Sequence, residues 1–207
     1  KTAYEISTRD WSSDVCSSDL TTEVTQSEWK KVMRTTPWAG QQHGESASRH
    51  PVTWVSRSDA EEFCRKLTER ERATSCIGSD LEYRLPSADE WLYATSAGAQ
   101  TAYHFGDDDE ALKSYEWCAR NSDETRAGGP RDVALKWPTR WGLYDTFGNV
   151  REMCIDDVCG GCWEDEKVSC QIVRARRSEV DLEKTGFRVV LVQLGGPKAT
   201  ATMRSRR

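Results

Sequence analysis

Apolar residues recur at helical spacing in the first hundred residues of this chain. The clearest case predicts a helix that begins near Ser56 or Ser58. One face of this helix carries apolar residues at i, i+3, i+4 and i+7, namely Ala60, Phe63, Cys64 and Leu67. Cysteine on such a face behaves as a small buried apolar residue, so we expect Cys64 in the core.

Two capping boxes predict two further helices. The stretches Thr25–Glu28 (TQSE) and Ser87–Glu90 (SADE) each place a hydroxyl residue three positions before a glutamate. In that arrangement the hydroxyl accepts a hydrogen bond from a free backbone N–H, and the glutamate reaches back to the first residue. Trp29 and Trp91 follow directly, so each helix is expected to bury a tryptophan.

Beyond residue 98 the helical periodicity is mostly lost. The run FGDDDEAL (105–112) predicts an acidic turn followed by a short helix, and GFRVVLV (186–192) predicts a buried strand. Helices come early in the chain, and loops with short strands come late. The pattern therefore indicates an α+β fold in which much of the chain is irregular.

The two ends of the chain differ from the middle. Residues 1–20 contain WSSDVCSSDL, which repeats Ser-Ser-Asp and resembles translated adapter sequence at the ends of assembled environmental sequences. We interpret them as a non-native or disordered leader and draw nothing from Cys16. Residues 194–207 are expected to form a basic flexible tail. A single domain is thus predicted over residues 21–193.

Composition narrows the classes of partner. Lysine and arginine total 29 against 34 aspartates and glutamates, and the formal net charge is −5. A nucleic-acid binder would carry a basic face, so no nucleic-acid partner is expected. No stretch approaches the roughly 18 apolar residues of a membrane-spanning helix. A protein or peptide ligand remains as the partner class, and the oligomeric state is left open.

The segment Trp141–Cys154 (WGLYDTFGNVREMC) places two acids inside an apolar, aromatic stretch. Calcium binds about six to eight oxygens and commonly combines carboxylates with backbone carbonyls. Asp145 and Glu152 can supply carboxylates, while Gly148 and Val150 can supply carbonyls. Two acids at this spacing are also compatible with a solvated loop.

Six ordered blocks resemble the formylglycine-generating enzyme family, also called sulfatase-modifying factors. The blocks are TTEVTQSEWKKVM, HPVTWVSRSDAEEFCRKL, YRLPSADEWLYATSAG, WGLYDTFGNVREMCID, GGCW and GFRVVL. The resemblance runs from about Thr21 to Val192. It implies a compact, loop-rich α+β domain related to C-type lectins. It also implies that the family's structural calcium loop falls on Asp145, Gly148, Val150 and Glu152.

The same resemblance implies an activity, the oxidation of a sulfatase cysteine to formylglycine. The family holds copper(I) with two cysteines that have four residues between them. Cys170 stands at the second position and is the one catalytic residue carried over, but Asp165 stands at the first. A carboxylate is a hard ligand and a poor partner for copper(I), which prefers thiolates. The standard copper pair is therefore absent.

Four cysteines fall within a short stretch and leave several readings open. These are Cys154, Cys159, Cys162 and Cys170. They are compatible with a zinc site of four thiolates, a redox Cys159-Gly-Gly-Cys162 motif, disulfides, or buried thiols. Cys162 with Cys170 would be a rearranged copper pair. The three histidines, at positions 43, 50 and 104, show no ligand spacing.

Three functional hypotheses follow. The first is a calcium-stabilised binding or accessory domain that lacks the standard copper site, and the second is an active copper-dependent formylglycine-generating oxidase. The third is a variable ligand-binding protein of a diversity-generating retroelement, because residues 164–184 correspond to the ligand-binding surface of such relatives. Many relatives are exported, which favours an exported or periplasmic location.

Overall fold

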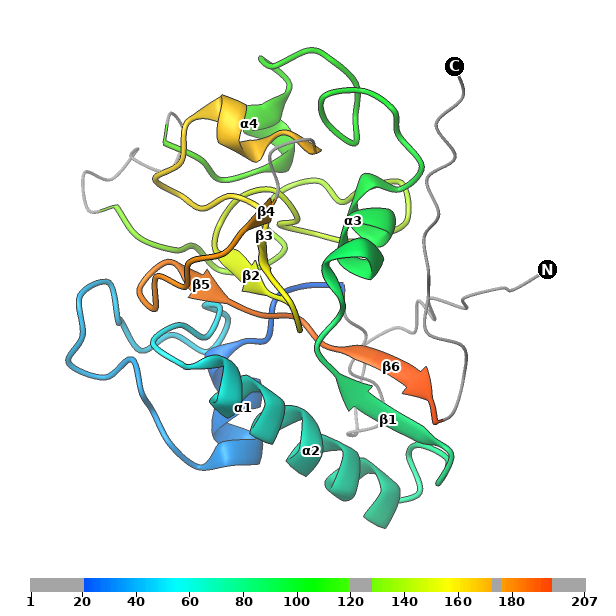
Figure 1. Cartoon of the computed structure of the whole chain (residues 1–207). Coiled ribbons are helices and arrows are strands. Elements are labelled where there is room, and N and C mark those ends of the chain that lie inside the picture. Colours follow the sequence, from blue (N-terminus) through cyan, green and yellow to red (C-terminus); the bar gives the residue numbers. More distant parts are fainter. Residues whose placement is uncertain (1–20, 120–127, 173–175, 195–207) are drawn as a thin grey trace.

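The computed structural model describes residues 21–119, 128–172 and 176–194 (Figure 1). The predicted leader and all but the first residue of the predicted tail lie outside these ranges. No helix in the described part of the chain is long and apolar enough to cross a membrane.

The three predicted helices are confirmed. They are α1 (Gln26–Met33), α2 (Arg57–Ala73) and α3 (Ala88–Ser96). Each begins at a capping box: the glutamate or aspartate at the third position accepts a hydrogen bond from the backbone N–H of Thr25, Ser56 or Ser87, at 2.6, 2.9 and 2.9 Å. These signals act within one turn of helix, which is why the sequence reveals them.

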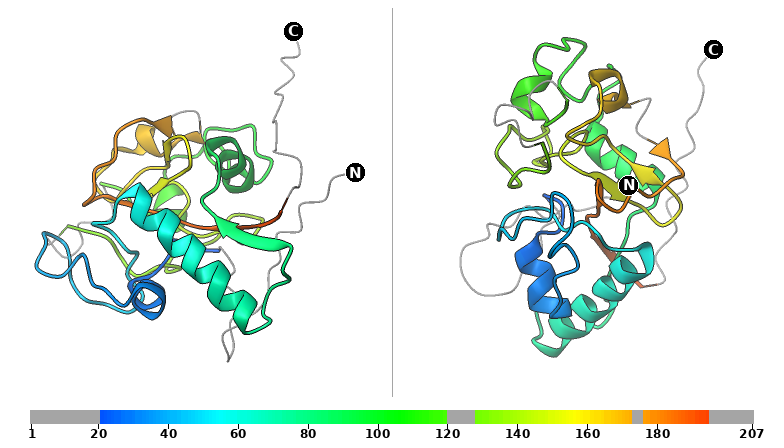
Figure 2. Two further views of the ribbon diagram at one scale, coloured as in Figure 1. Left: turned by 60° about the horizontal axis from the view of Figure 1, so that its bottom comes forward. Right: turned by 90° about the vertical axis from the view of Figure 1, so that its left-hand side faces the viewer.

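Two short helices lie at the opposite end of the molecule from α1 and α2. The helix α4 (Leu112–Tyr115) follows the acidic turn, as predicted, and the 3-10 helix η1 (Lys167–Cys170) lies next to it. The right-hand view of Figure 2 shows α1 with α2 at one end and α4 with η1 at the other. The chain between these ends consists mostly of loops.

In the described part of the chain, six short strands form two sheets. In the first, β1 (Leu81–Arg84) pairs antiparallel with β6 (Val190–Gln193). The second has the order β4-β3-β2-β5 and lies at the centre of the molecule (Figure 1). Its members are β2 (Arg151–Met153), β3 (Val158–Cys159), β4 (Arg176–Arg177) and β5 (Thr185–Gly186). The predicted α+β class is confirmed.

The prediction of one buried strand over 186–192 is wrong in part. The chain leaves the central sheet at Gly186, and residues 187–189 cross to the other sheet before β6 begins. Phe187 and Val189 are buried in this crossing, whereas Leu191 in β6 is 40% exposed. The side chains of β6 alternate between intermediate and exposed, so one of its faces is open to solvent.

Two main apolar clusters lie on the two sides of β2. The first joins α1, α2 and β1, and it stacks Trp29 on Phe63 with Phe187 edge-on to both rings. The second packs Trp91 of α3 edge-on to Phe147, with a ring-centroid distance of 5.4 Å. The central sheet is therefore packed between two apolar clusters.

Candidate functional site

The site residues predicted from the sequence surround a buried ion pair. Glu152 of β2 and Arg188 of the crossing segment are 0% and 4% exposed. The Arg188 guanidinium donates to both carboxylate oxygens, with Nε–Oε2 2.5 Å and Nη2–Oε1 2.6 Å. The Trp91 indole N–H adds a third hydrogen bond to Oε2, at 2.6 Å. Both oxygens of Glu152 are therefore engaged.

Asp145 lies near this pair with one oxygen satisfied and one not. Its backbone is left-handed, with φ 53°, and its Oδ2 accepts a hydrogen bond of 2.7 Å from the backbone N–H of Ala134. The other oxygen is buried without a hydrogen-bond partner. Burial raises the pKa of Asp145 to about 7, although the bond from Ala134 opposes the shift.

Glu23 is a third buried acid that the sequence analysis did not select. Its side chain is fully buried, and neither carboxylate oxygen has a hydrogen-bond partner. Burial, followed by the charges of Asp145 and Glu152, raises the pKa of Glu23 well above its usual range. The one signal that the sequence offered is that Glu23 lies within the block TTEVTQSEWKKVM, which resembles the family.

Gly148 and Val150 are held by close packing. A Cβ at Gly148 would lie 2.4 Å from the backbone oxygen of Trp117, so only glycine fits there. Asn149 donates its backbone N–H to the same Trp117 oxygen at 2.9 Å. The Val150 side chain is buried against Cys162 and Trp163. The loop is thus fixed by its neighbours as well as by its acids.

As placed, one of the four predicted calcium ligands is already engaged by a cation. Glu152 is bound by a guanidinium, and a second cation beside it would be repelled. Within residues 21–119, 128–172 and 176–194, no group of three or more histidine, cysteine, aspartate or glutamate side chains is arranged to hold a metal ion. Calcium at Asp145, Gly148, Val150 and Glu152 stays a prediction, and it requires Glu152 to exchange Arg188 for the ion.

The residue at the first copper position has a structural partner. Asp165 forms a two-pronged pair with Arg151, with distances of 3.1 and 2.8 Å. The same carboxylate also accepts the backbone N–H of Cys162 at 3.0 Å. Arginine and carboxylate match each other in geometry, which makes such pairs specific. Asp165 therefore clamps the loop that precedes η1.

The thiols pair differently from the arrangements considered above. Cys159 contacts Cys154, with 3.4 Å between their sulfurs, rather than Cys162. Cys170 packs with Cys118 in the second apolar cluster, whereas Cys162 belongs to the small cluster around Trp163. Burial raises the pKa of Cys162 to about 11, so this thiol stays protonated at neutral pH.

The three histidines are spread over the fold. His43 lies 2.6 Å from Glu183, His50 lies 3.7 Å from Asp132, and the buried His104 lies 3.5 Å from Glu116. Each contacts a different acid, and none joins another histidine.

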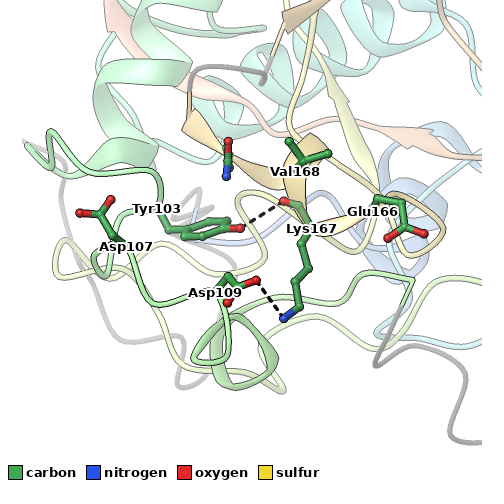
Figure 3. Close-up of a pocket in the computed structure, with 7 residues that line it drawn as sticks. Tyr103, Asp107, Asp109, Glu166, Lys167 and Val168 are labelled. Carbon is green, nitrogen blue, oxygen red and sulfur yellow. Dashed lines mark hydrogen bonds and ion pairs between the residues drawn. The ribbon is translucent and has the colours of Figure 1, made fainter.

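A pocket opens beside η1 (Figure 3). The helix η1 lies at the end of the molecule away from α1 and α2 (Figure 2). Its volume is about 420 Å³. Lys167 reaches across it to Asp109 at 3.3 Å and to Glu110 at 2.8 Å, and the Tyr103 hydroxyl donates to the Lys167 carbonyl at 3.4 Å. The lining residues are Tyr103, Asp107, Asp109, Glu166, Lys167, Val168 and Gln171.

The fold and the buried centre define a loop-rich α+β domain of the C-type-lectin-like class. A family model described as the sulfatase-modifying factor enzyme 1-like domain matches residues 2–192. The chain therefore belongs to this family, as its six blocks predicted.

Three solved structures share the fold. Treponema denticola variable protein 1 is 23% identical, with a TM-score of 0.70 over 84% of this chain and 83% of that chain. CarF is 20% identical, with a TM-score of 0.63 over 84% and 85%. PvdO from Pseudomonas aeruginosa is 19% identical, with a TM-score of 0.59 over 72% and 64%.

One curated relative is also similar. The chaperone protein LppX of Paenibacillus barcinonensis is 25% identical, and the match covers 64% of this chain. The match spans 59% of the length of that relative.

Proposed function

We propose that this chain is a binding or accessory domain of the sulfatase-modifying factor family that does not make formylglycine. The observation that carries the proposal is the Asp165–Arg151 clamp at the position of the first copper cysteine. An oxygen donor already committed to an arginine is a poor ligand for copper(I). The second copper position, Cys170, is fully buried. Both features argue against copper chemistry with the family's standard pair.

The first prediction concerns turnover. Purified protein incubated with copper(I), oxygen and a Cys-x-Pro-x-Arg peptide is expected to leave the peptide unchanged, because one of the two soft ligands is missing. Mass spectrometry of the peptide measures this directly. Aldehyde product that disappears in Cys170→Ser would overturn the proposal in favour of an active oxidase with a rearranged thiol pair.

The pocket beside η1 is the proposed ligand contact. Its lining carries the acids Asp107, Asp109 and Glu166 against one cation, Lys167, which is already paired. Such a surface favours a peptide with a positive charge, because complementary charge raises both encounter rate and specificity. A variable ligand-binding protein is a narrower form of the proposal, since η1 lies within residues 164–184.

The second prediction tests the pocket with a peptide that cannot react. A Ser-x-Pro-x-Arg peptide is expected to bind, and Glu166→Gln is expected to weaken binding about three- to tenfold, or up to about 1.4 kcal/mol. Isothermal titration calorimetry at low and moderate salt measures the affinities. Glu69→Gln on α2, whose side chain is 61% exposed, is the matched control. Equal affinity in both variants, or no binding at all, would remove the pocket from the proposal.

Calcium stabilisation is the third prediction. A sample with excess calcium is expected to have a higher melting temperature than a sample with chelator. A ligand at a hundred times its Kd stabilises the folded state by about 2.7 kcal/mol. Glu152→Gln should weaken the response because it removes a charged oxygen donor. Identical melting curves with and without chelator would show that Arg188 is the only cation this loop holds.

A further inference from the structure

Two cysteines of the central hairpin touch each other inside the core. Glu152 of β2 lies opposite Cys159 of β3, and the Cys154 N–H donates to the Asp157 carbonyl at 2.9 Å. Cys154 and Cys159 are therefore diagonal neighbours on one face of the hairpin. Their sulfurs are 3.4 Å apart, and both residues are 0% exposed.

A second thiol pair lies beside the pocket. Cys170, at the end of η1, and Cys118 are both buried in the second apolar cluster. The Ala119 N–H donates to the Asp165 carbonyl at 3.1 Å, which keeps the two segments together. Gly161 lies close to the sulfur of Cys170, since a Cβ at position 161 would be 2.7 Å from that atom.

We propose that these pairs are oxidation sites that close into two disulfides, Cys154–Cys159 and Cys118–Cys170, as the chain folds. A disulfide is about 2.05 Å long, so the first pair has to close by only about 1.4 Å. In each pair two S–H bonds break and one S–S bond forms. The two electrons and two protons pass to a thiol–disulfide oxidant, whose own disulfide is reduced to two thiols.

The timing follows from burial. Thiolates, not thiols, attack disulfides. All four thiols are buried in the folded domain, with exposed fractions of 2% or less. Once the core has closed, they are out of reach of an oxidant. The bonds are therefore structural ones made during folding, and not a switch in the finished domain.

The bond Cys118–Cys170 has a consequence for the pocket. It links the last residue of η1 to the segment that follows α4. The first two residues of η1, Lys167 and Val168, line the pocket. This consequence rests on the proposed function, whereas the two bonds themselves do not. If the reduced protein binds the Ser-x-Pro-x-Arg peptide as well as the oxidised protein does, the effect on the pocket is rejected and the two disulfides are unaffected.

The test is oxidative refolding of the unmodified chain in a glutathione redox buffer, followed by peptide mapping. Proteolysis at Asp156 or Asp157, between the two hairpin cysteines, is expected to leave fragments that stay linked until a reductant is added. The fragment with Cys118 should be linked to the one with Cys170 in the same way. Because no variant is needed, the mapping does not depend on whether a mutant folds.

Matched variants assign the hairpin bond. In Cys162→Ser the link across Asp156–Asp157 is expected to persist, and in Cys159→Ser it should be lost. Loss of the Cys118–Cys170 bond should lower the melting temperature more than loss of the Cys154–Cys159 bond, because Cys118–Cys170 closes the longer loop. A Cys159–Cys162 bond, or four thiols that remain open to alkylation after oxidative refolding and denaturation, would overturn the proposal.

Discussion

Replacing Arg188 with methionine is expected to destabilise the domain by about 3–5 kcal/mol, the usual cost of leaving a buried charge without its partner. Arg188 neutralises Glu152, and its Nη2 also donates to the Tyr144 carbonyl at 3.0 Å. Without the guanidinium, the buried acids Glu23, Asp145 and Glu152 face one another. Urea denaturation measures the loss as a lower free energy of unfolding.

The control for this prediction is an exposed arginine. Arg65 on α2 pairs with Glu62 and Glu69, but its side chain is 54% exposed. Arg65→Met should therefore cost much less stability than Arg188→Met, because exposed ion pairs contribute little. The double variant Arg188→Met with Glu152→Gln should recover part of the stability, because it removes one of the stranded charges. A loss at Arg188 no larger than at Arg65 would contradict the central role of the pair.

In the presence of chelator, the stability of the domain is expected to fall as the pH rises from about 4 through about 7. Burial raises the pKa of Asp145 to about 7 from its ordinary value of 3.8. The folded state therefore holds the proton more tightly than the unfolded state does. The contribution of Asp145 to stability is complete below its pKa in the unfolded state and is lost as the pH rises through its pKa in the folded state. A shift of this size corresponds to roughly 4 kcal/mol.

Asp145→Asn separates this effect from other titrations. The amide cannot ionise, so the variant should be more stable than the wild type at pH 8 and nearly equal to it at pH 4. Thermal unfolding across this pH range measures the difference. Glu69→Gln, on the exposed face of α2, should leave the pH dependence unchanged. A wild-type protein that gains stability up to pH 8 in chelator would show that Asp145 is ionised in the fold.

The helices could be predicted from the sequence because their signals are local. Ser87 and Glu90 are one turn apart, and both ends of the capping box are visible in four letters. The family blocks added the fold, which no local pattern could provide. The strands were harder to predict, because β3, β4 and β5 are two residues long, and β4 and β5 pair with strands far away in the chain.

The candidate site was predicted only in part, for the same reason. The sequence pointed to Asp145 and Glu152, but the ion pair of Glu152 joins residues 36 positions apart. Spacing could not reveal that Glu23 enters the same centre from the first described residues. Among the cysteines, the Cys-x-x-Cys spacing drew attention to Cys159 and Cys162, whereas the turn of the hairpin places Cys159 against Cys154.

Arg188 also sets the moment at which the domain can finish folding during synthesis. It donates to the carbonyl of Thr21 at 3.5 Å and holds Glu152, while Val24 binds the carbonyl of neighbouring Phe187 at 2.8 Å. The beginning and the middle of the domain are thus joined by residues close to its last strand. A nascent chain that has not yet released residue 188 from the ribosome carries its acids uncompensated, so its folding waits for the end of translation of the domain.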